Sequence, residues 1–95
     1  RVLIEIGQDY FDNGNLVEAK PALLKALQFN KALGYMDHTA KTYDIINYLY
    51  LVQGNVAEAT KAAFDYLKLS EQLGDKSIIG NAAYLLASNY QALGN

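Results

Sequence analysis

Apolar side chains recur along this chain at the spacing of an α-helix. Two segments forty residues apart share a stripe at positions i, i+3, i+4 and i+7, made by Leu3, Ile6, Gly7 and Tyr10 and then by Tyr43, Ile46, Asn47 and Tyr50. This spacing places the four residues on one side of a helix, which can then pack against a partner helix. Asn47 is the one strongly polar member of the two stripes.

Glycine–asparagine pairs separate the apolar segments. Gly14 and Gly54 can take the left-handed conformation that ends a helix, and Asn15 and Asn55 can cap the helix that follows. A glutamate stands three residues after each asparagine, which completes an Asn-x-x-Glu variant of the capping box. Each pair therefore predicts the end of one helix and the start of the next.

The pattern predicts five helices, at about Val2–Asn13, Leu16–Leu33, Asp37–Gln53, Val56–Leu73 and Lys76–Leu93. Asp37 and Asp75 are expected to cap the third and fifth helices. Pro21 lacks an amide hydrogen, so we expect a kink or a loose first turn in the second helix.

The chain repeats itself with a period of forty residues. "GNLVEA" starts at Gly14, "GNVAEA" starts at Gly54, and "GN" returns at Gly94. The positions identical to those forty residues later include Ile6, Tyr10, Gly14, Asn15, Glu18, Ala19, Ala22, Leu27, Leu33 and Gly34. Such a period is typical of proteins built from stacked repeats. We expect one repeat domain over residues 1–95, with units 1–40 and 41–80 and a partial unit 81–95, as a piece of a longer protein.

These units resemble the tetratricopeptide repeat, whose first helix carries Trp-x-x-Leu-Gly-x-x-Tyr and whose second carries Ala-x-x-x-Phe. The segments "LIEIGQDY", "YDIINYLY" and "AYLLASNY" carry the resemblance, with Ala19 and Ala59 at the small position of the second helix. Leu23 and Ala63 replace an aromatic residue of the family pattern, and Tyr66 replaces a small one. The resemblance implies an all-α fold of five antiparallel helices in a right-handed superhelical stack.

The repeat is longer than the common unit of about 34 residues. In this respect it is similar to the long repeats of kinesin light chains, polarity scaffolds and bacterial peptide-sensing regulators. The extra residues must extend the end of each second helix and the start of the next first helix, because the spacing from tyrosine through glycine to alanine is unchanged.

Composition and charge narrow the functional classes. The chain has no cysteine, which excludes disulfides, thiolate metal sites and cysteine nucleophiles. Its net charge is −2 and its charges are scattered singly, so we expect no nucleic-acid partner. No apolar run approaches the ~18 residues of a membrane span, so we expect no membrane partner. Nothing in the sequence fixes the compartment, for which the cytoplasm is favoured.

Candidate catalytic chemistry is sparse. His38 is the only histidine, and no nucleophile or carboxylate pairs with it in the sequence. A solvated residue at a helix start is therefore the simpler interpretation. We expect no enzymatic activity, no metal and no cofactor.

A second stripe on the first helix of each unit forms a candidate partner-binding groove. In the tetratricopeptide family this stripe lines the concave face. Here it comprises Ile4, Gln8, Phe11, Lys41, Asp44, Tyr48, Leu51, Val52, Tyr84 and Ser88. Its apolar members indicate capture of a peptide or helix from another protein, unless other parts of a parent protein cover them. Some family members grip a carboxylate with lysines and asparagines here, but Asp44 and Tyr48 disfavour that mode.

The alternative function is a ligand- or peptide-sensing segment of a larger signalling protein, such as a kinase or a transcription regulator. The last helix is also expected to form a homodimer, through the uncovered stripe of Ala83, Leu86, Ala87 and Tyr90.

Overall fold

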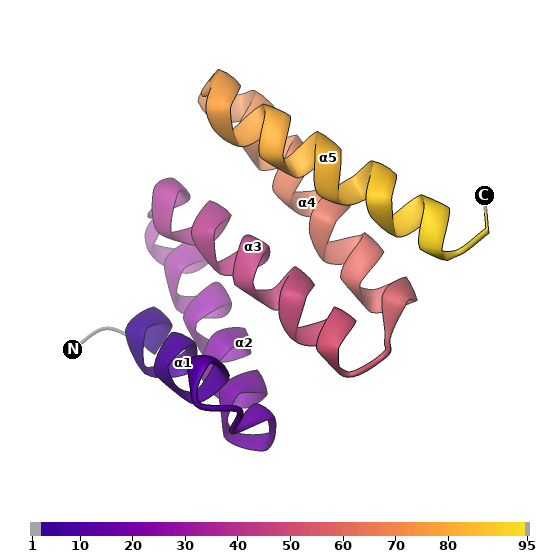
Figure 1. Cartoon of the computed structure of the whole chain (residues 1–95). Helices are drawn as coiled ribbons and strands as arrows, with labels where there is room; N and C mark the ends of the chain where they lie inside the picture. The colour runs from indigo at the N-terminus through magenta and orange to yellow at the C-terminus, as the bar shows by residue number, and fades with distance from the viewer. Residues whose placement is uncertain (1–2, 95) are drawn as a thin grey trace.

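The structure, a computed structural model, describes residues 3–94 and contains five α-helices within that range (Figure 1). They are α1 (Leu3–Asp12), α2 (Leu16–Leu33), α3 (Met36–Val52), α4 (Val56–Leu73) and α5 (Lys76–Ala92). No β-strand occurs in this range. The predicted all-α class and its five helices are confirmed. Val2, the predicted first residue of the first helix, lies outside the described residues.

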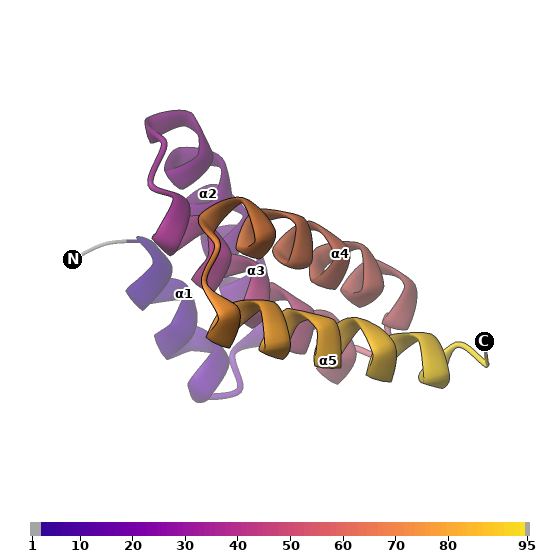
Figure 2. The ribbon, with the colours of Figure 1, turned by 90° about the horizontal axis from the view of Figure 1, so that it is seen from above.

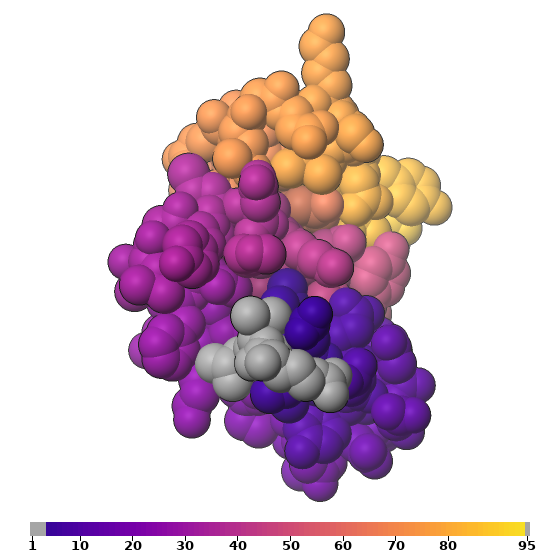
Figure 3. Space-filling model, turned by 90° about the vertical axis from the view of Figure 1, so that its left-hand side faces the viewer, coloured from indigo at the N-terminus to yellow at the C-terminus, as the bar shows by residue number. Residues whose placement is uncertain are grey.

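The helices are arranged in two layers. Figures 1 and 2 place α1, α3 and α5 in one layer and α2 and α4 in the other. Each helix packs against the next one in the chain, and α1 also contacts α3. In the space-filling view the beginning of α5 (orange) lies beside the α2–α3 turn and the beginning of α3 (magenta), with α1 (indigo) beyond them (Figure 3).

Glycines end the second and fourth helices. Gly34 and Gly74 have φ angles of 74° and 69°, in the left-handed region where a side chain would be strained. The Gly74 amide donates to the Ser70 carbonyl at 3.0 Å, which satisfies one of the last carbonyls of α4.

Side-chain caps start the fourth and fifth helices as predicted. Asn55 Oδ1 accepts a hydrogen bond from the Glu58 amide at 3.2 Å. Asp75 Oδ1 accepts one from the Ser77 amide at 3.0 Å. These bonds satisfy amides that have no partner inside the helix.

The starts of α2 and α3 differ from the predictions. Asn15 occupies the N-cap of α2, but its side chain makes no capping bond. The predicted cap at Asp37 is wrong, because α3 begins at Met36 with Tyr35 as its N-cap. Asp37 instead lies in the first turn, where its charge favours the helix N-terminus. The helix α2 continues across Pro21, because a proline near the helix start removes a single backbone hydrogen bond.

Small residues at repeated positions allow close packing. Ala19 and Ala59 are fully buried, and so are Leu23 and Ala63, about one turn later in the same helices. A Cβ atom placed on Gly7 would lie 2.7 Å from Leu23 Cγ, so only glycine fits where α1 meets α2. The lack of an aromatic residue at Leu23 and Ala63 is thus consistent with a tight interior.

The predicted core stripe is buried in α3 and more open in α1. Tyr43, Ile46 and Asn47 are all buried, whereas Tyr10 is 37% exposed. The difference follows from position, because α3 packs against α2 and α4 and also contacts α1. The side chain of Leu3 lies outside the described part of the structure.

A buried hydrogen bond joins α3 to α5. Asn89 Nδ2 donates to Asn47 Oδ1 at 2.7 Å, and both side chains are buried. Asn47 Nδ2 is buried without a partner. A buried amide without a partner lowers stability, so the pair has an energetic cost. Its directional hydrogen bond favours one alignment of the two helices.

Two glycines in helices give a matched stability test. Gly7→Ala is expected to lower the free energy of unfolding, because overpacking against Leu23 costs roughly 1–3 kcal/mol and the nearby Leu23 backbone nitrogen limits relaxation. Gly80→Ala meets no atom within 4 Å and should raise the free energy of unfolding by about 0.5–1 kcal/mol. Urea unfolding measures both values, and an equal gain in stability from the two variants would contradict the close approach of α1 and α2.

Candidate functional site

The predicted groove residues lie on the layer of α1, α3 and α5 and differ in exposure. Lys41, Tyr48, Val52, Tyr84 and Ser88 are exposed, and Gln8, Phe11, Asp44 and Leu51 are half-buried. Ile4 departs from the prediction because it is buried in the main core. The short helix α1 contacts both α2 and α3, so a larger part of its surface faces protein.

Tyr48 and Tyr84 bring together the α3 and α5 parts of this surface. Their side chains are 43% and 70% exposed. Burial raises the pKa of Tyr48 above its ordinary value, and the nearby Asp44 and Tyr84 raise it further. Asp44 and Tyr48 lie one turn apart on α3, and the effect of Tyr84 on the pKa of Tyr48 indicates that this residue of α5 lies nearby.

Asp44 is an under-solvated carboxylate in this site. Burial raises its pKa, and interaction with the Asn81 side chain lowers it by a smaller amount. The Oδ1 atom is shielded from solvent and accepts no hydrogen bond. Within residues 3–94, no lysine or arginine forms an ion pair with it. The charge of Asp44 therefore has no counterion among the described residues.

Tyr66 and Asn81 complete the site. Tyr66 is buried on α4, and its hydroxyl accepts a hydrogen bond from Asn81 Nδ2 of α5 at 3.0 Å. In the sequence, Tyr66 stands out only because it replaces a small residue of the tetratricopeptide pattern. The signal that could have found it is the repeat itself, because Ala26 holds the same position in the first unit.

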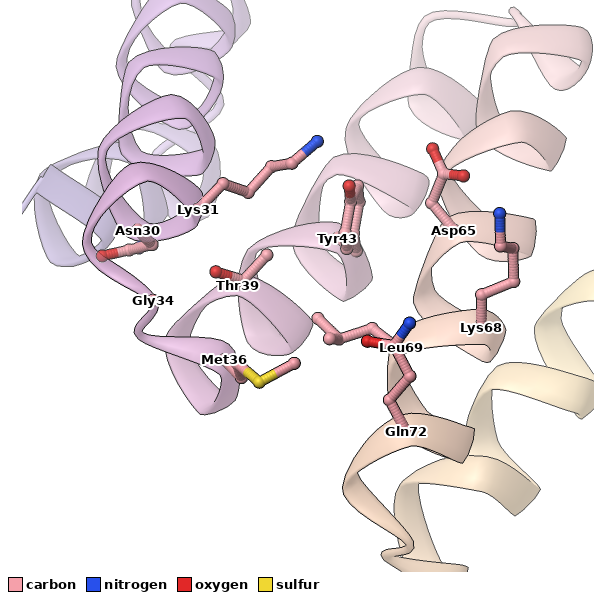
Figure 4. A pocket seen from close by; sticks show the side chains of 10 residues that line it. All are labelled: Asn30, Lys31, Gly34, Met36, Thr39, Tyr43, Asp65, Lys68, Leu69 and Gln72. Carbon is pink, nitrogen blue, oxygen red and sulfur yellow. The ribbon is translucent and has the colours of Figure 1, made fainter.

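A separate depression lies between α2, α3 and α4 (Figure 4). It has a volume of about 420 Å³ and was not predicted from the sequence. Its lining consists of Asn30, Lys31, Gly34, Met36, Thr39, Tyr43, Asp65, Lys68, Leu69 and Gln72. Lysines of α2 and α4 and an aspartate of α4 share this space, so it presents charges of both signs.

The described residues offer little for catalysis or metal binding. His38 is exposed, and its ring meets the Tyr35 ring edge-on at a centroid distance of 6.1 Å. Residues 3–94 contain no group of three or more histidine, cysteine or carboxylate side chains placed to hold a metal. Over the same range, no helix has both the length and the apolar character needed to cross a bilayer.

The predicted self-association residues lie mainly on the outer side of α5. Ala83, Ala87 and Tyr90 are exposed, and Leu86 is half-buried against the core. The buried side of the helix is formed by Ala82, Leu85 and Asn89. Packing of α5 on α4 therefore leaves Ala83, Ala87 and Tyr90 open to solvent.

Two comparisons with known proteins bear on the origin of this chain. No family model matches the chain, and no curated protein matches it. The relation of its units to the tetratricopeptide repeat remains a prediction that rests on the sequence motifs described above.

Because the pKa of Asp44 is raised, we expect the variant Asp44→Asn to gain stability against unfolding in a pH-dependent way. The carboxyl group of Asp44 keeps its proton to a higher pH in the folded protein than in the unfolded chain. The stability contributed by Asp44 is therefore complete below the ordinary aspartate pKa and is lost as the pH rises through the raised pKa of the folded protein. Asp44→Asn should be more stable than the natural protein at pH 7, by less than about 1 kcal/mol because water still screens the half-exposed group.

Urea unfolding at pH 7 and below pH ~4 tests this prediction. The advantage of Asp44→Asn should shrink at the lower pH. Asp65→Asn, at an exposed position of α4, is the matched control. The same pH-dependent gain in both variants would contradict a cause in the burial of Asp44.

Proposed function

We propose that this chain is a non-catalytic protein-interaction module of the tetratricopeptide type, with its helices stacked in a right-handed superhelix. In this proposal, the surface made by α1, α3 and α5 binds a peptide or a helix of another protein. The forty-residue repeat and the two-layer arrangement of five helices support the proposed stacking.

The exposed pair of Tyr48 and Tyr84 carries the proposal. Large aromatic side chains supply much contact area with few rotatable bonds, which is why they often dominate binding energy at interfaces. Val52 is also exposed on the same layer, and Leu51 and Phe11 are half-buried there. An apolar surface with polar neighbours such as Lys41 is typical of a protein-binding site.

Selection from a random peptide library displayed on phage tests this function. Peptides selected on the natural protein should lose at least about tenfold in affinity for the double variant Tyr48→Ala and Tyr84→Ala, since buried aromatic anchors contribute more than ~2 kcal/mol. The matched control is Phe29→Ala with Phe64→Ala, which removes two exposed aromatic residues from α2 and α4. Circular dichroism should show unchanged helicity in all variants.

Two results would contradict the proposal. In the first, the selected peptides lose affinity for the variant Phe29→Ala with Phe64→Ala but keep it for the variant Tyr48→Ala with Tyr84→Ala. The other is unfolding of the tyrosine double variant, which would mean that Tyr48 and Tyr84 belong to the core.

We also propose self-association through the outer side of α5. Ala83 and Ala87 would allow a second helix to approach closely, with Tyr90 covering its edge. Sedimentation velocity at micromolar concentration should show a dimer that Ala87→Glu dissociates. Ala57→Glu, at an exposed position of α4, should leave it intact. A monomeric natural protein at these concentrations would contradict this part of the proposal.

A further inference from the structure

We propose that the site of Asp44, Tyr48 and Tyr84 binds an arginine side chain of the partner peptide, with the guanidinium on the Asp44 carboxylate and the tyrosine rings beside it. This inference rests on the proposed function, because it names the side chain that the bound peptide carries. It assigns the site a ligand of positive charge, opposite in sign to a peptide carboxylate.

The first observation is the state of the Asp44 carboxylate. Its Oδ1 atom is shielded from water and accepts no hydrogen bond, while the side chain as a whole remains half-exposed. A carboxylate in this state lacks part of the hydration that stabilises its charge, yet it can be reached from solvent. A cationic ligand at the solvent-accessible part of Asp44 would supply the missing counterion.

The second observation is that no lysine among residues 3–94 pairs with Asp44. Asn81 donates Nδ2 to the Tyr66 hydroxyl and is neutral, so it adds no positive charge. Lys41 is exposed one turn before Asp44 on α3 and forms no ion pair with it. The other titratable group whose charge reaches Tyr66 is Asp75, which is negative. The charged groups that act on Tyr48 and Tyr66 are therefore carboxylates, which are complementary to a cation.

The third observation concerns the aromatic rings. Elsewhere in this chain, two lysines form cation–π contacts. Lys20 Nζ lies 5.2 Å from the centroid of the Tyr50 ring, and Lys68 Nζ lies 5.6 Å from the centroid of the Phe64 ring. Over residues 3–94, no such cation covers Tyr48 or Tyr84. Two open tyrosine rings next to an unpaired carboxylate are the groups that recognise a cation through its charge and its π contacts.

Arginine fits these groups better than lysine. A guanidinium is planar, so it can stack on a tyrosine ring and still direct hydrogen bonds to a carboxylate. The compact ammonium of lysine keeps its hydration more strongly and has no plane to stack. Arginine is also enriched at the energetic centres of protein interfaces.

Titration with Nα-acetylarginine amide, followed by NMR, tests the inference without a known partner. The ring signals of Tyr48 and Tyr84 and the carboxyl signal of Asp44 should shift on addition of this probe. The neutral isostere Nα-acetylcitrulline amide should bind at least about fivefold more weakly, since a charge-assisted hydrogen bond is roughly twice as strong as a neutral one. Asp44→Asn should abolish the difference between the two probes.

Matched variants separate the parts of the site. Asp65→Asn should retain the preference for arginine. Tyr48→Phe should retain most of the affinity and Tyr48→Leu should lose it, because phenylalanine keeps the ring face. Equal binding of the arginine and citrulline probes, or an arginine preference that persists in Asp44→Asn, would overturn the inference. If Nα-acetyllysine amide binds more strongly than the arginine probe, the choice of arginine is wrong.

The phage-selected peptides distinguish this inference from the proposed function. One outcome supports both the interaction module and the arginine site. In that outcome, the peptides require Tyr48 and Tyr84 and carry an arginine. Replacing that arginine by citrulline weakens binding to the natural protein but not to Asp44→Asn. If they require the tyrosines and carry no such arginine, the arginine site is wrong and the interaction module stands. If no peptide and no probe binds, both are wrong.

Discussion

The hydrogen bond between Asn47 and Asn89 is the constraint on which the site depends. It joins α3 to α5 across 42 positions of sequence and is buried. Apolar packing alone is non-directional and would tolerate a shift of one helix along the other. A buried amide pair is satisfied in one alignment only, as buried asparagines in coiled coils also show. The unpaired Nδ2 of Asn47 indicates that alignment has been obtained at some loss of stability.

That alignment determines which side chains share the surface of α3 and α5. Asp44 lies one turn before Asn47, and Tyr84 lies five residues before Asn89. We infer that holding the two asparagines together keeps Tyr84 of α5 close enough to Tyr48 of α3 to raise the pKa of Tyr48. A second link, from Asn81 to Tyr66 on α4, fixes the beginning of α5 from the other layer. The site is thus a consequence of helix packing and needs no loop to build it.

Much of the fold could be predicted from the sequence, because helical spacing, glycine stops and asparagine caps are local signals that the forty-residue repeat presents twice. The site was less predictable. The helical angle placed Asp44, Tyr48 and Tyr84 on one surface, but it could not show that Ile4 would be buried between helices. The roles of Asn89 and Tyr66 depend on partners in other helices, and a single sequence without tertiary contacts gives no sign of these pairings. The start of α3 was missed because Tyr35 has no capping side chain to reveal it.

A double-mutant cycle on Asn47→Leu and Asn89→Leu tests the constraint most directly. Each single variant leaves one buried amide without its partner and should lower the free energy of unfolding by roughly 1–3 kcal/mol. The double variant replaces both polar groups by apolar ones of similar size, so it should be much more stable than the sum of the single losses predicts. Losses that add to within ~0.5 kcal/mol would contradict a hydrogen bond between α3 and α5 and, with it, the alignment that forms the site.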